Sequence, residues 1–230
     1  MSTYAFPEIS TRPATKPKTV WLIASGDLRE SANQSGWPIQ AEMETALGRA
    51  LSSAGWATQR ANPVDPATGH GFITSQRMGM EVFKNIPHDA PLIVAEAIWQ
   101  YSHHVLHGLR NHRGPIITIA NFAGDAPGLV GLLGLNAGLR KMGTPYSSLW
   151  SVDFTDEWFL AHLKTWLDEG KVEHSLDHVR PMTSAPKDSP ESRVGVALAE
   201  KLTTDKAIFG VFDEGCMGMY NAIIDDEIMN

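Results

Sequence analysis

The fold is decided by two segments, PLIVAE at residues 91–96 and PIITIA at residues 115–120. Both are continuous apolar runs, which is typical of strands buried on both faces of a parallel sheet. A helix-like segment at residues 102–111 separates them, so together they predict a strand–helix–strand unit.

The same alternation continues on both sides of this unit. Further strands are expected at residues 19–24, 56–61 and 146–150. Further helices are expected at residues 39–54, 72–83, 128–141 and 154–169, with Pro38 in a first helical turn. The pattern predicts an α/β fold with a doubly wound, mostly parallel sheet, in a flavodoxin-like or Rossmann-like order.

Proline and serine content suggests how the chain is divided. Residues 1–18 are expected to be a flexible lead-in, and residues 19–180 an N-terminal α/β domain. Residues 181–190 (PMTSAPKDSP) hold three prolines and two serines, which predicts a linker. Residues 191–230 are expected to start a second α/β domain, with a helix at 191–203, a strand at 206–211, a turn at 213–218 and a helix from residue 220. This tail either docks on the first domain or opens a domain that is not present.

Composition and charge exclude several classes of protein. The 230 residues include 19 Lys plus Arg against 26 Asp plus Glu, a net charge of −7, which argues against a nucleic-acid partner held by phosphate contacts. The single cysteine, Cys216, excludes a disulfide scaffold. The longest apolar stretch, residues 126–139, contains Pro127 and four glycines and falls short of the ~20 residues that a membrane span needs. The N-terminus has no signal-peptide core, so we expect a cytoplasmic protein without membrane contact.

Parallel sheets bind ligands outside the carboxyl ends of their strands, so functional residues are expected at 25–37, 97–104 and 121–128. The first of these segments is expected to be a polar loop. Its side chains Arg29, Glu30, Asn33 and Gln34 could hold a polyol or could simply be solvated. Trp99 follows a strand end, where its indole could stack on a sugar or pack in an interface.

Three other motifs have competing interpretations. His103 and His107 have the i,i+4 spacing of a zinc pair, but the glutamate of that motif is absent, so HHVLH favours an interface or a solvated face, also for His104. The glycines of residues 128–138 do not match a phosphate loop and favour close packing of another helix. Asp213 and Glu214 would raise the pKa of the Cys216 thiol, which disfavours a nucleophile.

Four segments together resemble the N-terminal part of the L-fucose isomerase / L-arabinose isomerase family. They are LRES at residues 28–31, IVAEAIWQY at 93–101, the strand–loop–helix segment at 114–143, and FGVFDEGCMGMYNAIIDDE at 209–227. The last of these is similar to the turn that opens the second domain of the family.

The resemblance implies a three-domain, homo-oligomeric enzyme that converts an aldose to a ketose with a divalent metal, typically Mn²⁺. Metal ligands and catalytic carboxylates of the family lie in its second and third domains, so none is assigned here. The resemblance implies substrate contacts for Trp99, Met217 and, more weakly, Arg29. The expected function is therefore the N-terminal part of a sugar isomerase that contributes substrate-site and oligomer contacts and is inactive alone. The alternative is a non-catalytic sugar-binding or subunit-interaction module.

Overall fold

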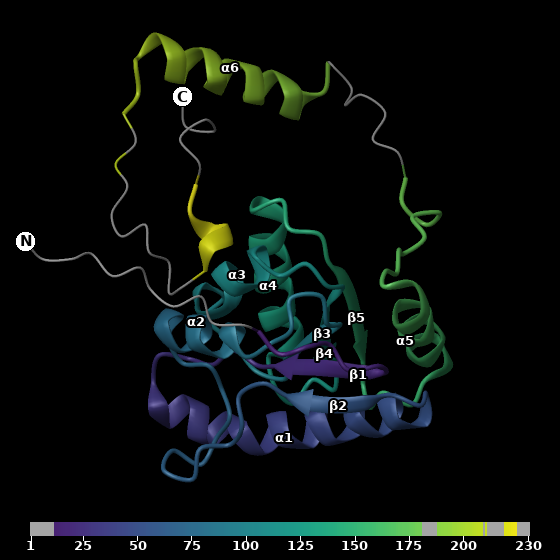
Figure 1. Cartoon of the computed structure of the whole chain (residues 1–230). Coiled ribbons are helices and arrows are strands. Elements are labelled where there is room, and N and C mark those ends of the chain that lie inside the picture. The colour runs from purple at the N-terminus through teal and green to yellow at the C-terminus, as the bar shows by residue number, and fades with distance from the viewer. Residues whose placement is uncertain (1–11, 181–187, 209, 211–218, 225–230) are drawn as a thin grey trace, which may run out of the picture. The chain divides into compact units, whose positions relative to one another are not determined.

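The computed structural model describes residues 12–180, 188–208, 210 and 219–224 (Figure 1). These residues fall into two compact units, one made of the residues up to Val172 together with 219–224, and one that begins at Glu173. The first unit contains a five-stranded sheet in the order β2-β1-β3-β4-β5, and every neighbouring pair is parallel. Its strands are β1 (Thr19–Ile23), β2 (Ala57–Arg60), β3 (Leu92–Glu96), β4 (Ile116–Asn121) and β5 (Ser147–Ser151). The predicted α/β, doubly wound sheet is confirmed.

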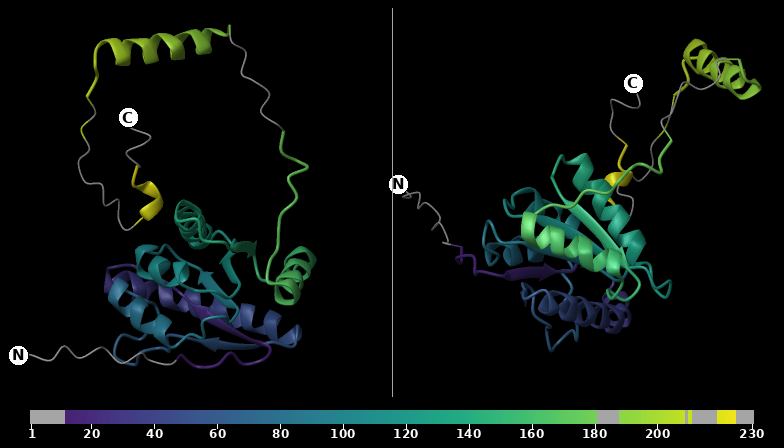
Figure 2. Two further views of the ribbon diagram at one scale, coloured as in Figure 1. Left: turned by 45° about the horizontal axis from the view of Figure 1, so that its top comes forward. Right: turned by 90° about the vertical axis from the view of Figure 1, so that its right-hand side faces the viewer.

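Helices cover both faces of this sheet (Figures 1 and 2). One face packs against α1 (Glu30–Ser53) and α5 (Glu157–Glu169), and its core includes Leu47 and Trp166. The other face packs against α2 (Gln76–Lys84), α3 (His103–Arg110) and α4 (Gly128–Lys141). Because β1 and β3 are fully buried between the two layers, their sequences are apolar without alternation. Among the described residues, none of the helices has both the length and the apolar character to cross a membrane.

Local signals explain several helix boundaries. The Asp156 side chain accepts a hydrogen bond from the Phe159 N–H and caps α5. Gly170 then ends α5 in the left-handed region, with φ 75°, where a side chain would be strained. Ser75 caps α2 in the same way as Asp156 caps α5.

The predicted loop at residues 25–37 is wrong over most of its length. Helix α1 begins at Glu30, and Pro38 lies inside it rather than in its first turn. The face of α1 that packs inward starts with Asn33 and Gly36, which are buried but not apolar. A search for apolar residues at helical spacing therefore finds only the second part of this helix.

The predicted helix at residues 72–83 starts too early. Helix α2 begins at Gln76, and the preceding Phe72 and Ile73 are fully buried outside any helix. Ile73 instead continues the hydrogen bonding of β1, because its N–H donates to the Ala24 carbonyl and its carbonyl accepts from the Gly26 N–H. Two adjacent apolar residues occur both in buried extended segments and at the start of amphipathic helices, so the sequence pattern does not distinguish the two structures.

The second unit contains α6 (Pro190–Thr204), close to the predicted helix at 191–203. Of the predicted strand at 206–211, the described residues 206–208 and 210 are not in a strand. The predicted turn at 213–218, with Cys216 and Met217, lies outside the described residues.

Residues 219–224 belong to the first unit and contact α4. A short 3-10 helix, η2 (Tyr220–Ala222), stands where a longer helix was predicted, and residues 225–229 of that prediction lie outside the described residues. The Lys141 ammonium lies 4.8 Å from the centre of the Tyr220 ring and donates to the Ile223 carbonyl oxygen at 2.5 Å.

Candidate functional site

The candidate site lies at the carboxyl edge of the sheet, between β1 and β3. These two strands are neighbours, but the chain leaves β1 for α1 on one face and leaves β3 for α3 on the other. Such a divergence opens a crevice at the strand ends, which is where doubly wound folds bind ligands. The Tyr101 N–H donates to the Gly26 carbonyl at 3.0 Å and ties the two outgoing segments together.

A hollow of about 330 Å³ occupies this place, and we call it the carboxyl-edge hollow. Its wall is formed by the segment after β1, the first turns of α1, the segment after β3 and residues 125–127 before α4. Its main lining residues are Asp27, Arg29, Ser35, Ile98, Trp99 and Asp125. The half-buried Trp99 and the exposed Arg29 therefore contribute to one cavity from separate strand ends.

Asp27 and Arg29 form a tight local pair. The Arg29 Nε and Nη2 atoms donate to the two carboxylate oxygens of Asp27 at 3.0 and 2.8 Å. These hydrogen bonds lower the pKa of the Asp27 carboxyl, so it is ionised at neutral pH. Asn33 fixes the backbone of Asp27 from both sides, accepting from its N–H at 2.8 Å and donating to its carbonyl at 2.9 Å. The pair is thus held in place before any ligand arrives.

The segment carrying Trp99 is positioned by Gln40 of α1. The pairing of β1 with β3 ends at Val94, so the next residues of β3 have no strand partner on that side. The buried Gln40 side chain takes the place of a strand, donating to the Ala95 carbonyl at 3.1 Å and accepting from the Ala97 N–H at 3.0 Å. Directly after this contact the chain turns to present Trp99 to the hollow.

A second hollow of about 410 Å³ continues from the first and shares Ile39 and Asp125 with it. It lies between α1 and the loops that follow β4 and β5. Its charged lining residues are Glu42, Arg49, Asp125 and Asp153. Hydrogen bonds from Thr155 lower the pKa of the Asp153 carboxyl, so the rim of this extension carries negative charge.

A buried polar group lies beside the hollow, at the end of β3. Glu96 is 1% exposed, and burial raises the pKa of its carboxyl well above the ordinary value, which favours the protonated form. Among the described residues, Glu96 Oε1, Gln100 Oε1 and Asn121 Oδ1 are buried without a hydrogen-bond partner. Gly131 of α4 brings that helix against this group, since a Cβ there would lie 3.4 Å from Glu96 Oε2.

The structure places the residues predicted from sequence as follows. Arg29 and Trp99 meet at the carboxyl-edge hollow, whereas Met217 lies outside the described residues. None of the other polar residues predicted to hold a polyol lines this hollow. The Glu30 carboxylate lies 3.2 Å from the His70 Nε2 atom, and the Gln34 amide donates to Glu30. Asn33 accepts from the Asp27 N–H. Sequence reasoning missed Asp27, Asp125 and Gln40, although the Asp–x–Arg spacing of residues 27–29 was available as a signal.

The histidines of α3 do not converge. His104 is buried, with Nδ1 3.0 Å from the Ile73 carbonyl oxygen, and burial lowers its pKa. His103 is half-buried with its ring edge on Tyr220, and His107 is exposed. The described part of the chain contains no group of three His, Cys, Asp or Glu side chains able to hold a metal ion. At the carboxyl-edge hollow the Asp27 carboxylate is already bound by Arg29, so the residues present do not fit a manganese centre.

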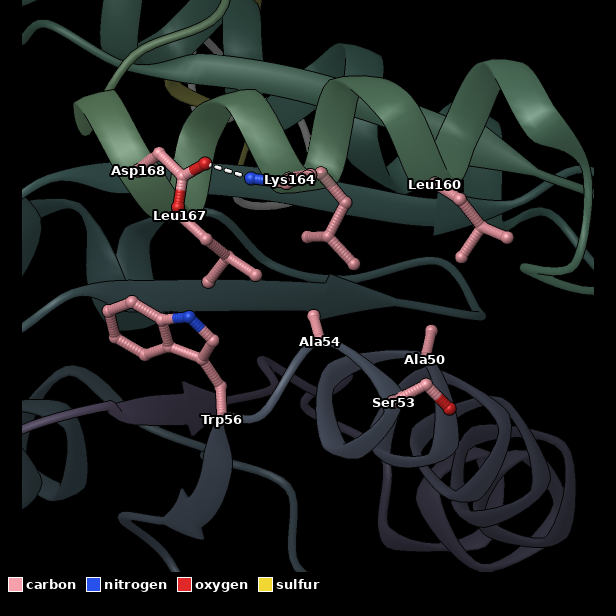
Figure 3. A pocket seen from close by; sticks show the side chains of 9 residues that line it. Ala50, Ser53, Ala54, Trp56, Leu160, Lys164, Leu167 and Asp168 are labelled. Atoms are coloured by element: carbon pink, nitrogen blue, oxygen red, sulfur yellow. Dashed lines mark hydrogen bonds and ion pairs between the residues drawn. The ribbon is translucent and has the colours of Figure 1, made fainter.

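A further hollow of about 270 Å³ lies between the C-terminal part of α1 and α5, and we call it the α1–α5 hollow (Figure 3). Trp56 and Leu167 face each other across it, with Ala50 and Leu160 along its sides. Its charged pair, Lys164 and Asp168, lies on successive turns of one helix and is exposed. This hollow is an apolar gap between two helices, without polar groups converging from different segments.

Comparison with known protein families gives no match to this chain, and comparison with curated proteins gives no significant match. The family resemblance of the four sequence segments therefore stands without support from these comparisons. The structure does bring together Arg29 and Trp99, two of the residues that the resemblance implies as sugar contacts. They meet at the edge of the sheet where this fold binds ligands.

Proposed function

We propose that the carboxyl-edge hollow binds a sugar and that this chain is the N-terminal part of a metal-dependent aldose–ketose isomerase similar to L-fucose and L-arabinose isomerases. One observation carries the proposal: Arg29 and Trp99 come from separate strand ends and line a single cavity. The proposal places the protein in the cytoplasm, where it acts on a small sugar as part of a homo-oligomer.

The lining of the hollow suits a polyhydroxylated ligand. The flat indole of Trp99 offers an apolar surface for the C–H face of a sugar ring. The exposed carboxylate of Asp125 can accept hydrogen bonds from hydroxyl groups, and the exposed guanidinium of Arg29 can donate to a ring or hydroxyl oxygen. The buried carboxylate of Asp27 holds that guanidinium in place. A volume of about 330 Å³ is at the small end of ligand pockets, which fits a monosaccharide.

Within this proposal the chain binds and orients the substrate. Asp27, held by Asn33 and paired with Arg29, fixes the direction of hydrogen bonds to the sugar. Trp99, held through Gln40, fixes the plane of the ring and excludes water from one side. A manganese ion would supply Lewis-acid polarisation of the sugar oxygens in the whole enzyme. The described residues do not fit that ion, so no step through it is assigned to them.

Calorimetry with the 230-residue chain tests the binding step. We expect L-fucose or L-arabinose to bind with a millimolar dissociation constant, unchanged by Mn²⁺. Arg29→Ala should weaken that binding, because it removes the guanidinium that would donate to the sugar and leaves Asp27 without its partner. Absence of binding for pentoses, hexoses and their polyols alike would overturn the proposal.

An activity assay tests the assignment of chemistry. We expect no aldose–ketose conversion by the 230-residue chain with Mn²⁺ and robust conversion by the full-length gene product. Robust turnover by the short chain would overturn our placement of the catalytic groups outside it.

The second candidate is a non-catalytic sugar-binding module. It is favoured by the fact that the described residues lining the carboxyl-edge hollow all belong to the first unit. A reading frame that ends after residue 230 would select the module. A frame that encodes a further α/β domain with paired carboxylates and a late histidine would select the isomerase.

A further inference from the structure

Helix α4 is apolar on both of its faces. Its inward face consists of Gly128, Gly131, Leu132, Leu135, Gly138 and Leu139, all buried. Its outward face carries Val130 and Leu133, which are 52% and 57% exposed, with Gly134 and Ala137 on the same stripe. No charged residue occurs in α4 before Arg140 in its last turn. A helix that is apolar all round is normally buried. Residues 219–224 contact α4 near Lys141, whereas Val130 and Leu133 lack a cover among the described residues.

Gly134 also lacks an explanation within the protomer. A Cβ on Gly131 would lie 2.5 Å from the Ile98 carbonyl oxygen, and one on Gly138 would lie 3.3 Å from the Leu106 side chain. Those glycines let α4 approach the sheet and α3. A Cβ on the half-buried Gly134 would meet nothing within 4 Å, although glycine inside a helix costs about 0.5–1 kcal/mol relative to alanine.

The charges at the two ends of this face are opposite in sign. Asp125 lies just before α4 and Arg140 in its last turn, and both are exposed. In the part of the chain that the structure describes, neither forms an ion pair. A surface with an apolar middle, an acid at one end and a base at the other is complementary to itself after a two-fold rotation.

We propose that the outward face of α4 is the contact surface of a homodimer, in which two α4 helices pack antiparallel about a two-fold axis beside Leu133 and Gly134. In this arrangement Leu133 of each copy enters the space over Gly134 of the other. Val130 then lies opposite Ala137, and Arg140 approaches Asp125 of the second copy. The occupant is a second copy of this chain, because an antiparallel copy pairs both ends with opposite charge while filling the space over Gly134.

The size of the surface sets the expected affinity. A helix of 14 residues is about 21 Å long, so one pair of helices covers less than the roughly 800 Å² per partner of a standard interface. The dimer is therefore expected to dissociate in the micromolar range. The two proposals share Asp125, which also lines the carboxyl-edge hollow, but Leu133 lies outside that hollow. Loss of the dimer in a Leu133 variant therefore leaves the sugar proposal standing, and loss of sugar binding leaves the dimer standing.

Analytical ultracentrifugation of the full 230-residue chain across a concentration series tests the proposal. The mass should rise from monomer towards dimer, and Leu133→Glu should raise the dissociation constant at least tenfold by placing a carboxylate in the apolar centre. Met80→Glu is the matched control, since Met80 is a similarly exposed apolar residue on α2, with 51% exposure. Equal loss of association in both variants, or a monomeric wild-type chain at every concentration, would overturn the proposal.

A charge exchange keeps the test independent of misfolding. Arg140→Glu alone should weaken the dimer several-fold, because it places two acids against each other across the axis. The double variant Asp125→Arg/Arg140→Glu should restore association, since the exchanged charges again pair. Circular dichroism confirms that each variant is folded. A double variant no tighter than Arg140→Glu would overturn the antiparallel pairing.

Discussion

The carboxyl-edge hollow and the α1–α5 hollow differ little in size, about 330 against 270 Å³, yet they differ in how they are built. The first gathers Asp27, Trp99 and Asp125 from the ends of different strands, and its walls are held by side-chain hydrogen bonds. The second is bounded by two helices and by Ala54 and Trp56, which follow one of them.

The difference shows that the convergence of polar groups, and not volume, distinguishes the hollow that we propose as the binding site. An apolar gap arises wherever two helices on the same face of a sheet do not meet, since a twisted sheet separates them. Polar groups from distant segments converge only where the topology directs several strand ends to one place. The predictions that follow disturb each hollow in turn.

The largest effect is expected for Gln40→Leu. The substitution leaves the Ala95 carbonyl and the Ala97 N–H buried without the side-chain partner they now have. Each such loss costs about 1–3 kcal/mol, so we expect about 3 kcal/mol less unfolding free energy in urea. Gln34→Leu, at an exposed position of the same helix, should change stability little. Equal effects of the two changes would contradict the role given to Gln40.

Glu96→Gln should change how stability depends on pH. The unfolded carboxyl ionises near its ordinary pKa of 4.5, whereas burial keeps the folded one protonated above that value. The folded state then holds one proton more, so stability falls by about 1.4 kcal/mol per pH unit as pH rises from 4.5 towards the folded pKa.

Urea unfolding from about pH 5 to pH 7 measures this slope. The Gln variant should show a flatter dependence, because the amide does not titrate. Asp168→Asn, at the α1–α5 hollow, is the matched control, since it removes a carboxylate at an exposed position. Parallel curves for wild type and Glu96→Gln would be incompatible with a buried acid behind the carboxyl-edge hollow.

Substitution of Trp99 and of Trp56 tests which of the two hollows binds the sugar. Trp99→Ala should weaken sugar binding about tenfold, equivalent to about 1.4 kcal/mol, because the stacking surface is lost. Trp56→Ala removes an equally large, half-buried side chain from the α1–α5 hollow and should leave sugar binding unchanged, although it lowers stability. Calorimetry on both folded variants checks this. Similar losses of sugar affinity would show that the carboxyl-edge hollow is not the sugar site.

The smallest effect is expected from filling the apolar hollow. Ala54→Leu directs added methylene groups towards Leu167 and Trp56, and burying part of them should stabilise the protein by about 1 kcal/mol. Ala161→Leu adds the same groups at an exposed position of α5 outside the hollow. If both variants have the same midpoint in urea, the α1–α5 hollow does not accept side chains.

The fold was predictable where a buried element has a distinctive local sequence. Strand β3 and helix α4 fall close to their predicted ranges, because the first is continuously apolar and the second is bounded by Pro127 and a basic last turn. The start of α1 was not predictable in this way. Its inward residues Asn33 and Gly36 serve the backbone of Asp27 and the approach of Ile98, which are contacts between distant segments.

The sequence predicted where the site lies better than it predicted which residues form it. Strand order places functional residues at the carboxyl edge, and Arg29 and Trp99 were found by that rule. Asp125 and Gln40 were missed because their roles depend on which segments become neighbours in space. Gln40 in particular looks like an ordinary polar residue of a helix, and only the unpaired end of β3 explains its burial.

The strand order also determines when the hollow can exist during synthesis. Strand β1 pairs first with β2 and gains β3 only later, and the wall at residues 125–127 follows β4. Asp27 and Pro127 are about 100 residues apart, which takes about 5–20 s of translation at typical rates. Until then the nascent chain exposes the apolar surfaces of β1 and β3. A ligand that binds this hollow therefore meets only chains that have passed residue 127, and it stabilises an arrangement that forms after the first strands.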